Sequence, residues 1–339
     1  MAFGLATAPY PLTGTVGVNP SPAYTANFIP EIWSGKMIEK FYATTVLAAI
    51  SNTNYEGEIK NHGDKVIIRT RPTVAIRDYS AGQQLVFERP SSTPLTLNID
   101  KGKYFNVIMD DVHEVQSDFN MLSLWSEDAA EQMKISIDTD VLIAMLGDAH
   151  ASNKGTTAGV KTGTINLGVT GAPLSIVARA PTVGQVEVTD LIVRMGQVLD
   201  EQNIPETGRW LVVPAWFAAR IKMSELRDAS LTGDGTSILR NGRLGMIDRF
   251  TIYVSNLTVK GGYIVGTTPG YPTGTPPMAA GEWAVFAGVT NAFTFATQMT
   301  RMETLRSEST FGTIMRGLQV YGMGIIDPTA LVEAIVVPA

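Results

Sequence analysis

The feature that most constrains this chain is a continuous apolar stripe from about residue 118 to residue 146. Apolar side chains recur there at spacings of three and four residues, the period of one helix face: Leu122, Trp125, Ala129, Met133, Ile137, Val141 and Ala144. Ser117 or Asp118 can cap the start of a helix, and Gly147 can end it. At ~1.5 Å per residue such a helix reaches about 43 Å, longer than most globular helices. The stripe predicts a spine helix over residues 118–146, against which other segments pack.

Short strand patterns precede the spine and predict an extended β-ribbon over residues 56–110. Five strand-like stretches are separated by turn signals, at residues 65–70, 73–77, 85–88, 95–99 and 104–109. The ribbon has few large apolar side chains near its tip, and its charged residues include Arg69, Arg71, Arg77, Asp78, Glu88 and Arg89. Because an isolated two-stranded hairpin is marginally stable in water, we expect the ribbon to need a partner surface. A merely solvated charged face is the alternative interpretation.

The first 55 residues predict an arm followed by a docking helix. Residues 1–30 are rich in Pro, Gly, Thr and Ala and carry no charge, so they cannot form a core of their own. Apolar side chains then return at broken helical spacing as far as Phe41, with Trp33 among them. No basic residue precedes the apolar residues of this segment, so we expect no secretory signal.

A mixed α+β pattern follows the spine. After loops and short strands over residues 149–185, helix and strand patterns alternate at residues 189–202, 209–213, 215–223, 250–254 and 282–287. Thr189 or Asp190 is the expected cap of the first of these helices. Long Gly/Pro loops near Asp234 and across residues 261–281 are typical of interaction surfaces or of disordered segments. Two apolar strands, at residues 317–322 and 332–337, are expected to return and pair near the spine helix.

Composition excludes several classes of function. The net charge is −6, with Lys+Arg 26 against Asp+Glu 32, so the chain lacks the basic excess of a dedicated DNA-binding domain. It has no cysteine, which excludes disulfides and thiolate metal sites and fits folding in a reducing cytosol. No run of about 18 apolar residues is present, so we expect no membrane contact.

No catalytic, cofactor or metal residue can be assigned. The three histidines are His62, His113 and His150, and none lies in a catalytic motif. Carboxylates around His113, at Asp110, Asp111 and Glu114, could hold a divalent ion, but the spacings of known metal motifs are missing, and a solvated acidic turn is favoured. Glycines at residues 233–235 lack the lysine of a phosphate-binding loop. We therefore expect a protein that is not an enzyme and binds no cofactor.

The order of these segments resembles the major capsid (coat) proteins of tailed double-stranded DNA bacteriophages, whose fold is shared by herpesviruses and encapsulins. The phrases that carry the resemblance are IPEIWSGKMIEKF (29–41), GDKVIIR (63–69), the stretch 106–115 before the spine helix, RWLVVPAWF (209–217), GRLGMIDRFTIYVSN (242–256) and GLQVYGMG (317–324). Together they cover nearly the whole chain.

The resemblance implies an α+β capsid fold with named parts. These are an N-terminal arm and docking helix (1–55), an extended β-hairpin loop over a neighbouring subunit (56–110), a peripheral domain with the spine helix (111–188), an axial domain (189–312) and return strands to the peripheral domain (313–339). Candidate subunit-interface residues are Trp33, Arg69, Arg71, Arg77, Asp78, Glu88, Arg89, Glu127, Glu131 and Asp234.

By the same resemblance, the chain would assemble into pentamers and hexamers of an icosahedral head around double-stranded DNA. Its expected partners are further copies of itself, a scaffolding protein, a portal protein, in some cases a decoration protein, and DNA held by non-specific contact. The first residue, Met1, favours a separate scaffold over a removed prodomain. Assembly is expected in the host bacterial cytoplasm, and the final location is the virion.

Two alternatives remain open at this stage. An encapsulin-like nanocompartment would share the fold but enclose enzyme cargo. A β-rich carbohydrate-binding or adhesin-like protein would use the Gly/Thr loops to bind a ligand, although the central helix and the expected lack of a signal peptide argue against it.

Overall fold

The computed structural model describes the chain in eight stretches. These are residues 45–54, 65–70, 72, 74–92, 94–116, 121–224, 245–261 and 278–339. The chain divides into a unit of residues 1–41 and a unit of residues 42–339, and every described residue belongs to the second. Of the expected arm and docking helix (1–55), only residues 45–54 are described, and Trp33, the loop with Asp234, and residues Arg71 and His62 lie outside the described residues.

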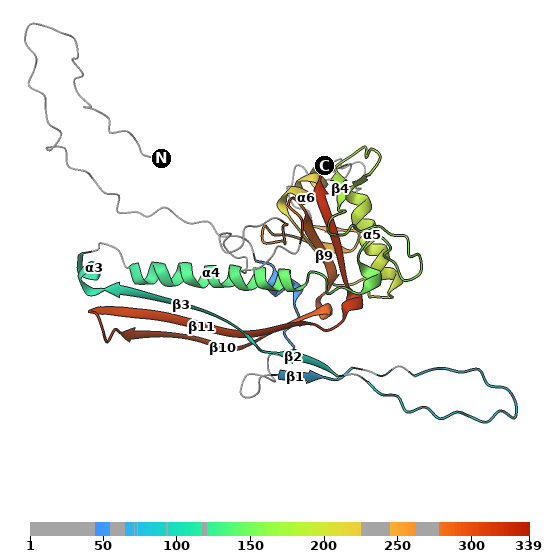
Figure 1. Cartoon of the computed structure of the whole chain (residues 1–339), viewed down its shortest axis with the longest axis horizontal. Coiled ribbons are helices and arrows are strands. Elements are labelled where there is room, and N and C mark those ends of the chain that lie inside the picture. Colours follow the sequence, from blue (N-terminus) through green and yellow to red (C-terminus); the bar gives the residue numbers. More distant parts are fainter. Residues whose placement is uncertain are drawn as a thin grey trace, which may run out of the picture. The chain divides into compact units, whose positions relative to one another are not determined.

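The predicted spine helix is confirmed as α4, Met121–Ala144. It contacts a long antiparallel sheet of three strands in the order β10 (Phe293–Arg306), β11 (Gly312–Ile325) and β3 (Lys101–Asp110) (Figure 1). A short helix, α3 (Asp111–Gln116), continues from β3, so the acidic turn expected here is helical. The buried residues of α4 all lie in its C-terminal half, where Ile137, Val141 and Leu142 face the core.

The second sheet has seven strands and is buried on both faces. Its order is β5 (Gln185–Glu187), β4 (Leu174–Val177), β12 (Leu331–Pro338), β9 (Trp283–Val289), β6 (Arg209–Val213), β8 (Phe250–Val254) and β7 (Met246–Ile247). The pairs β5–β4, β4–β12 and β6–β8 are parallel, whereas β9 runs antiparallel to β12 and β6. Residues 209–213 and 250–254 are strands as predicted.

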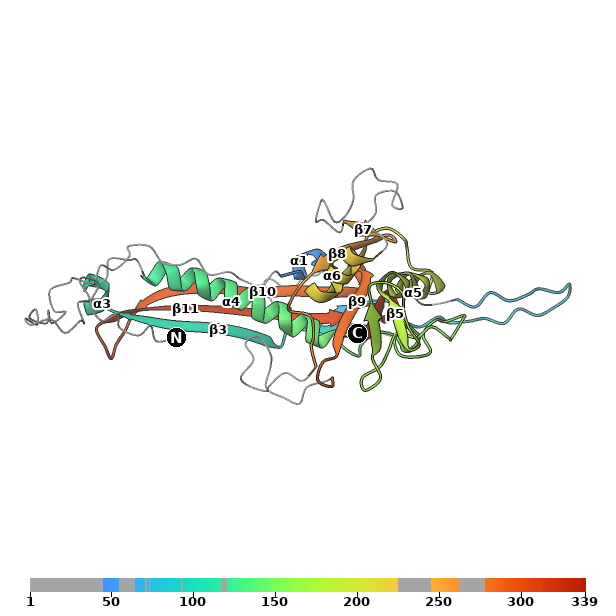
Figure 2. The same cartoon turned by 90° about the horizontal axis from the view of Figure 1, so that it is seen from above.

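Strand β6 shows why this sheet forms. Leu211 and Val213 belong to a core with helices α5 (Val188–Glu201) and α6 (Ala215–Met223), whereas Trp210 and Val212 belong to a core with the end of α4. Because successive side chains point to opposite faces, a strand covered on both sides is apolar without alternation. The run RWLVV is buried at every position. Figure 2 shows α5 and α6 lying against this sheet.

A third, small sheet forms the base of the ribbon. Strands β1 (Lys65–Ile68) and β2 (Leu95–Asn98) pair antiparallel over four residues each. Ile68, Leu97 and Ile99 pack there with Ala296 of β10, so the base is fixed to the long sheet. Short 3-10 turns at Ala151–Asn153, Thr290–Ala292 and Pro328–Ala330 complete the described elements.

The prediction of strands at residues 73–77 and 85–88 is wrong. The described residues between 74 and 92 adopt no regular strand, and their chain reverses at Gly82, which has φ +86°. All of these residues are exposed, so no buried cross-strand pairs are present to stabilise a ladder. The expected ribbon strand at 104–109 is also reassigned, because β3 is an edge strand of the long sheet.

Two further expectations are corrected. The two C-terminal strands do not pair together near the spine: β11 is central in the long sheet, and β12 lies between β9 and β4 in the seven-stranded sheet. The first six residues of β12 are all buried, which suits a central strand covered on both faces. Helix α5 begins at Val188 and has no side-chain cap, so neither Thr189 nor Asp190 caps it.

A buried carboxylate joins the spine helix to the segment before the ribbon. Asp138 on α4 accepts backbone N–H bonds of 3.0 Å from both Val46 and Leu47 at the start of α1 (Leu47–Ile50). Burial raises the pKa of Asp138 from 3.8 to about 6, although the two N–H bonds oppose this shift. The Asp138 side chain therefore fastens α1 to the spine in a pH-dependent manner.

We expect the contribution of Asp138 to the free energy of unfolding of the unassembled chain, measured as the difference between the unmodified chain and Asp138→Asn, to fall as pH rises from about 4 to 7. Because the folded-state pKa of Asp138 lies above its ordinary value, its stabilising contribution is complete below pH 3.8 and is lost as pH rises through about 6. The loss is on the order of 3 kcal/mol at ~1.4 kcal/mol per pKa unit. Urea denaturation across this range should show it, and Asp138→Asn should flatten the curve. An unchanged slope in that variant would contradict the assignment.

Candidate assembly interface

The part of the ribbon beyond β1 and β2 exposes large apolar side chains. Ile76 and Phe87 are 93% and 95% exposed, and the same stretch exposes Val74, Tyr79, Leu85 and Val86. The expectation of few large apolar residues near the tip is therefore wrong. The sequence contains these apolar residues but does not show that they are exposed. They are exposed because no paired strand or other element covers them. A patch of this kind on a folded protein commonly marks a surface that binds a partner.

The charged candidates of the ribbon accompany this apolar patch. Arg69, Arg77, Asp78, Glu88 and Arg89 are all exposed. Within the described residues none of them forms an ion pair. The Glu88 carboxylate accepts one hydrogen bond, of 3.3 Å, from the backbone N–H of Ala75. The structure thus places five sequence-predicted residues on one extended segment.

The two candidates on the spine helix have a different setting. Glu127 is exposed on α4. Glu131 forms a 2.5 Å ion pair with Lys134 one turn further along. Such pairs at spacing i,i+3 are ordinary features of a solvated helix face, so the structure gives Glu131 no distinctive role at an interface.

The outer face of the long sheet offers an open groove. The residues that line it include Tyr104 and Asn106 from β3, Arg301 and Glu303 from β10, and Arg316 and Leu318 from β11. The register places Leu318 between Tyr104 and Arg301, and Arg316 between Asn106 and Glu303. Tyr104 is 79% exposed. The groove therefore combines apolar rings and chains with charge.

Electrostatics make this groove locally positive. The Glu303 carboxylate lies 2.7 Å from the Arg316 guanidinium and 2.5 Å from that of Arg301. The hydrogen bond from Arg316 and the charge of Arg301 hold the pKa of Glu303 below its ordinary value. One carboxylate shared between two guanidinium groups leaves a net positive charge, which suits an acidic side chain from a partner.

Helix α4 packs against the inner face of the long sheet. Lys103 of β3 forms a 2.7 Å ion pair with Asp140, and the Tyr321 hydroxyl of β11 donates a 2.9 Å hydrogen bond to the same carboxylate. Burial and the negative charge of Asp140 raise the pKa of Tyr321, so its hydroxyl stays a donor. These contacts fix the sheet on the spine and leave its other face outward.

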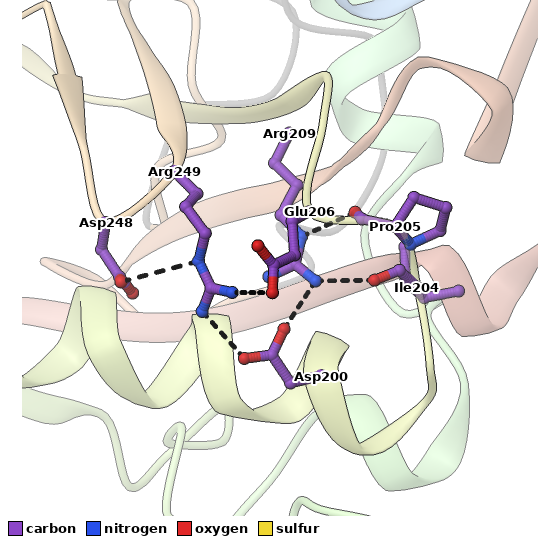
Figure 3. Close-up of polar contacts among 7 residues, drawn as sticks. All are labelled: Asp200, Ile204, Pro205, Glu206, Arg209, Asp248 and Arg249. Atoms are coloured by element: carbon purple, nitrogen blue, oxygen red, sulfur yellow. Dashed lines mark hydrogen bonds and ion pairs between the residues drawn. The ribbon is translucent and has the colours of Figure 1, made fainter.

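A buried arginine organises the end of the seven-stranded sheet, and sequence reasoning missed it. The Arg209 guanidinium donates to Asp200 at 2.6 Å and to the carbonyls of Ile204 at 2.7 Å and Pro205 at 2.9 Å (Figure 3). Arg249 pairs with Asp200 at 2.9 Å and with Glu206 at 2.7 Å. Burial acts to raise the pKa of Asp200, but the hydrogen bonds from both arginines lower it overall.

This cluster is structural in character. It joins the end of α5, the start of β6 and the β7–β8 turn, where Asp248 and Arg249 have φ of +46° and +67°. Non-glycine residues at positive φ are held there by surrounding contacts, and the arginine pairs supply them. Its only sequence signal is Arg209 at the start of an otherwise apolar strand.

The described part of the chain shows no group of three or more His, Cys, Asp or Glu side chains placed to hold a metal. Asp111, considered as a ligand candidate, instead forms a two-bond ion pair with Arg306. Within the same part of the chain, no helix is long and apolar enough to cross a membrane.

The two sheets, the spine helix and the exposed ribbon define a capsid fold that solved phage structures share. One is from Mycobacterium phage Che8, at 26% identity and TM-score 0.71, covering 91% of this chain and 97% of that one. Another is the capsid of cyanophage P-SCSP1u, at 16% identity and TM-score 0.69, covering 96% and 97%. The mature capsid of bacteriophage PhiM1 matches at 14% identity and TM-score 0.63, covering 94% and 95%.

The sequence matches the phage capsid protein family over residues 93–334, more than half of the chain. The chain therefore belongs to this family, and it is a shell-forming structural subunit of the virion capsid. No curated protein gave a significant match. The alternative of a carbohydrate-binding or adhesin-like protein is set aside by the family and the fold.

Replacing Arg209 should destabilise the fold strongly. The Arg209→Met variant removes a buried guanidinium that donates to Asp200 and to the carbonyl oxygens of Ile204 and Pro205, so we expect a loss of about 3 kcal/mol in the free energy of unfolding. The matched control is Arg249→Met, whose partly exposed pairs should contribute less than about 1 kcal/mol. Chemical denaturation of both unassembled variants tests this. Equal effects would show that burial of Arg209 does not determine its contribution.

Proposed function

We propose that the chain is the major subunit of an icosahedral phage head, and that the ribbon of each copy lies on the outer face of the long sheet of a neighbouring copy. The observation that carries this proposal is the row of exposed apolar side chains between Val74 and Phe87. Because burial of apolar surface is favourable, the free energy falls when another copy covers these side chains.

Magnitudes support the use of many copies. Burying one large apolar side chain contributes roughly 1.5–3 kcal/mol, and ordering a flexible segment on binding opposes this gain. A single ribbon contact is therefore modest. In a closed shell each copy gives one ribbon and receives another, so many modest contacts act together.

Both surfaces carry charges of both signs that can pair across the contact, because Arg77 and Arg89 stand beside the acidic residues of the ribbon and Glu303 lies between the arginines of the groove. The ribbon carries Asp78 and Glu88 close to its apolar residues, and the groove on the long sheet carries Arg301 and Arg316 with a single carboxylate between them. The apolar parts of the groove, Tyr104 and Leu318, match Ile76 and Phe87 of the ribbon in character. This pairing fixes an orientation as well as a contact.

The remaining parts of the proposal follow the family resemblance. The seven-stranded sheet with α5 and α6 would form the axial domain at the centres of pentamers and hexamers. The spine helix and the long sheet would form the peripheral domain. A separate scaffold, a portal protein and in some heads a decoration protein would complete assembly in the host cytoplasm. The net charge of −6 would let packaged DNA move along the shell without tight binding.

Polar substitution of the ribbon should block assembly without unfolding the chain. For the pair Ile76→Ser and Phe87→Ser we expect an unchanged denaturation midpoint and at least a tenfold lower yield of particles in electron micrographs. The control is Val183→Ser, which changes a fully exposed valine on a loop outside the ribbon. Normal particle yield from the double variant would contradict the ribbon contact.

Charge substitution tests the polar half of the contact. Changing Arg77, Asp78, Glu88 and Arg89 together to alanine should leave monomers folded and impair shell formation, because the exposed charges contribute little within the monomer. Negative-stain microscopy with and without a scaffold partner is the measurement. Normal shells would leave the apolar residues as the only part of the ribbon needed for assembly.

Analysis of particle contents tests the shell function itself. Shells purified from infected cells should contain double-stranded DNA and not enzyme cargo, which nuclease treatment and gel analysis can distinguish. Protein cargo without DNA would favour a nanocompartment.

A further inference from the structure

Within the described residues, the base of the ribbon is not hydrogen-bonded to any strand of the two larger sheets. Strands β1 and β2 pair with each other and form a sheet of their own. Ile99 and Asp100 join β2 to β3, at the end of the long sheet that lies away from α3 (Figure 1). Because no ladder continues from the long sheet into the ribbon, packing of the base against that sheet fixes the direction of the ribbon.

The base packs on a part of the long sheet that carries very small residues, which we call the seat. The seat is the cross-strand pair of Ala296 on β10 and Gly322 on β11. Ala296 is fully buried in a small apolar cluster with Leu97 and Ile99, and none of these three residues belongs to the two larger cores. Small residues at this pair allow the backbone of β2 to come close to the long sheet.

The approach is very close at Gly322. A Cβ atom built on Gly322 would lie 3.1 Å from the carbonyl carbon of Asn98, nearer still to the carbonyl oxygen, and 3.0 Å from Cγ1 of Ile99. Carbon atoms pack at ~3.5–4.0 Å, so no side chain fits between β11 and this part of the chain. Gly322 does not have a positive φ, so its own backbone conformation does not require glycine. The requirement comes from the backbone of Asn98.

Other glycines of the long sheet provide comparisons. A Cβ atom on Gly102 of β3 would meet its nearest neighbour at 3.9 Å, which is an ordinary contact. A Cβ atom on Gly317 of β11 would lie 2.7 Å from Cζ of Phe105, but a side chain can change its torsion angles and move aside. The carbonyl group of Asn98 is part of the backbone of β2, so it can move only if the strand moves.

We propose that Gly322 is a positioning residue that sets the direction in which the ribbon leaves the subunit. A side chain at this position would displace Asn98 by about 1 Å and tilt β2, a strand of four residues that is about 13 Å long. Residues 84–94 extend the ribbon by at most about 37 Å at ~3.4 Å per residue. Over this length the same tilt moves the end of the ribbon by roughly 3 Å.

The consequence for assembly rests on the proposed shell function, in which the ribbon of each copy lies on a neighbouring copy. Displacement of the ribbon end by roughly 3 Å would take Ile76 and Phe87 out of their places on the groove, because interfaces are packed as closely as protein interiors. The direction set at the seat therefore decides whether the exposed apolar residues can be covered. The seat itself belongs to a single copy, so it can be measured without assembly.

The absence of cysteine allows spin labels to be placed on the unassembled chain without background. Gln84→Cys labels the exposed end of the ribbon, and its partner is either Val193→Cys on α5 or Met223→Cys on α6, both at exposed positions. Double electron–electron resonance measures the two distances, which lie along different directions. We expect Gly322→Ala to shift the mean of at least one distance by about 3 Å.

Two matched controls replace a glycine of the same sheet by alanine. Gly102→Ala adds its methyl group in open space, and Gly317→Ala adds it against a side chain that can move aside. Both should leave the two mean distances within about 1 Å of those of the unmodified chain. A folded Gly322→Ala chain with both distances unchanged would overturn the proposal.

Leu97→Ala tests the seat without adding atoms. Leu97 is 2% exposed and packs in the cluster of the seat and not in the two larger cores, so the body of the variant should stay folded. We expect both distance distributions to broaden by roughly half, because the base loses a buried apolar contact that holds it on the long sheet. Distributions of unchanged width would show that the seat does not hold the ribbon, and this result also counts against the proposal.

Particle assembly separates the seat from the shell function. We expect Gly322→Ala to lower the yield of particles in electron micrographs at least about tenfold, and Gly102→Ala to leave it normal. A shifted distance together with normal particles would support the role of Gly322 and contradict the ribbon contact between copies. If the unmodified chain forms no particles under any condition, the shell function fails, whereas the distance measurements still decide the role of Gly322.

Discussion

The fold depends on covering both apolar faces of the seven-stranded sheet. Helices α5 and α6 cover one face, and the C-terminal half of α4 covers the other together with Phe293 and Tyr321 from the long sheet. Strands such as β6 and β12 carry buried, mainly apolar side chains on both faces, so exposing either face to water would destabilise the fold. The spine helix therefore joins the two larger sheets. Its C-terminal half packs in a core with the seven-stranded sheet, and the helix also contacts β3 and β11 of the long sheet.

Two buried carboxylates reinforce this junction. Asp138 holds the start of α1 on the spine, and Glu333 of β12 accepts the backbone N–H of Gly147 at 2.7 Å just after the spine ends. Burial raises the pKa of Glu333, as it does that of Asp138. Each carboxylate satisfies backbone groups at a helix end that apolar packing would leave without partners. The connection between the spine and its neighbours is thus both apolar and directional.

The described surfaces that lie farthest from these cores are the ones left for other copies. The ribbon beyond β2, the outer face of the long sheet and the turn of residues 307–311 expose large apolar side chains. The subunit can be stable alone because its cores do not use these residues. It can also assemble because the free energy falls when neighbouring copies cover these exposed residues. Stability of the subunit and association between subunits are therefore carried by different side chains.

Local pattern was sufficient where an element's own residues decide its conformation. The strand at 209–213 and the helix at 215–223 match the prediction, and the spine helix lies within the predicted range 118–146. Pattern failed where a partner decides the outcome. The residues at 73–77 and 85–88 favour strands, but without buried cross-strand contacts they form none. The cluster around Arg209 depends on Asp200, Ile204 and Pro205 meeting β6 in space, which spacing along the chain does not specify.

The sequence by itself determined the periodic elements and the charge and cysteine content that exclude several kinds of chemistry. Only the tertiary structure decided that β11 and β12 enter different sheets, and which apolar residues remain in water. Periodicity arises from contacts between residues close in sequence, so it can be read from the chain. Burial depends on contacts between distant residues, so Ile76, Phe87 and Phe311 could be recognised as exposed only after the strands had been placed.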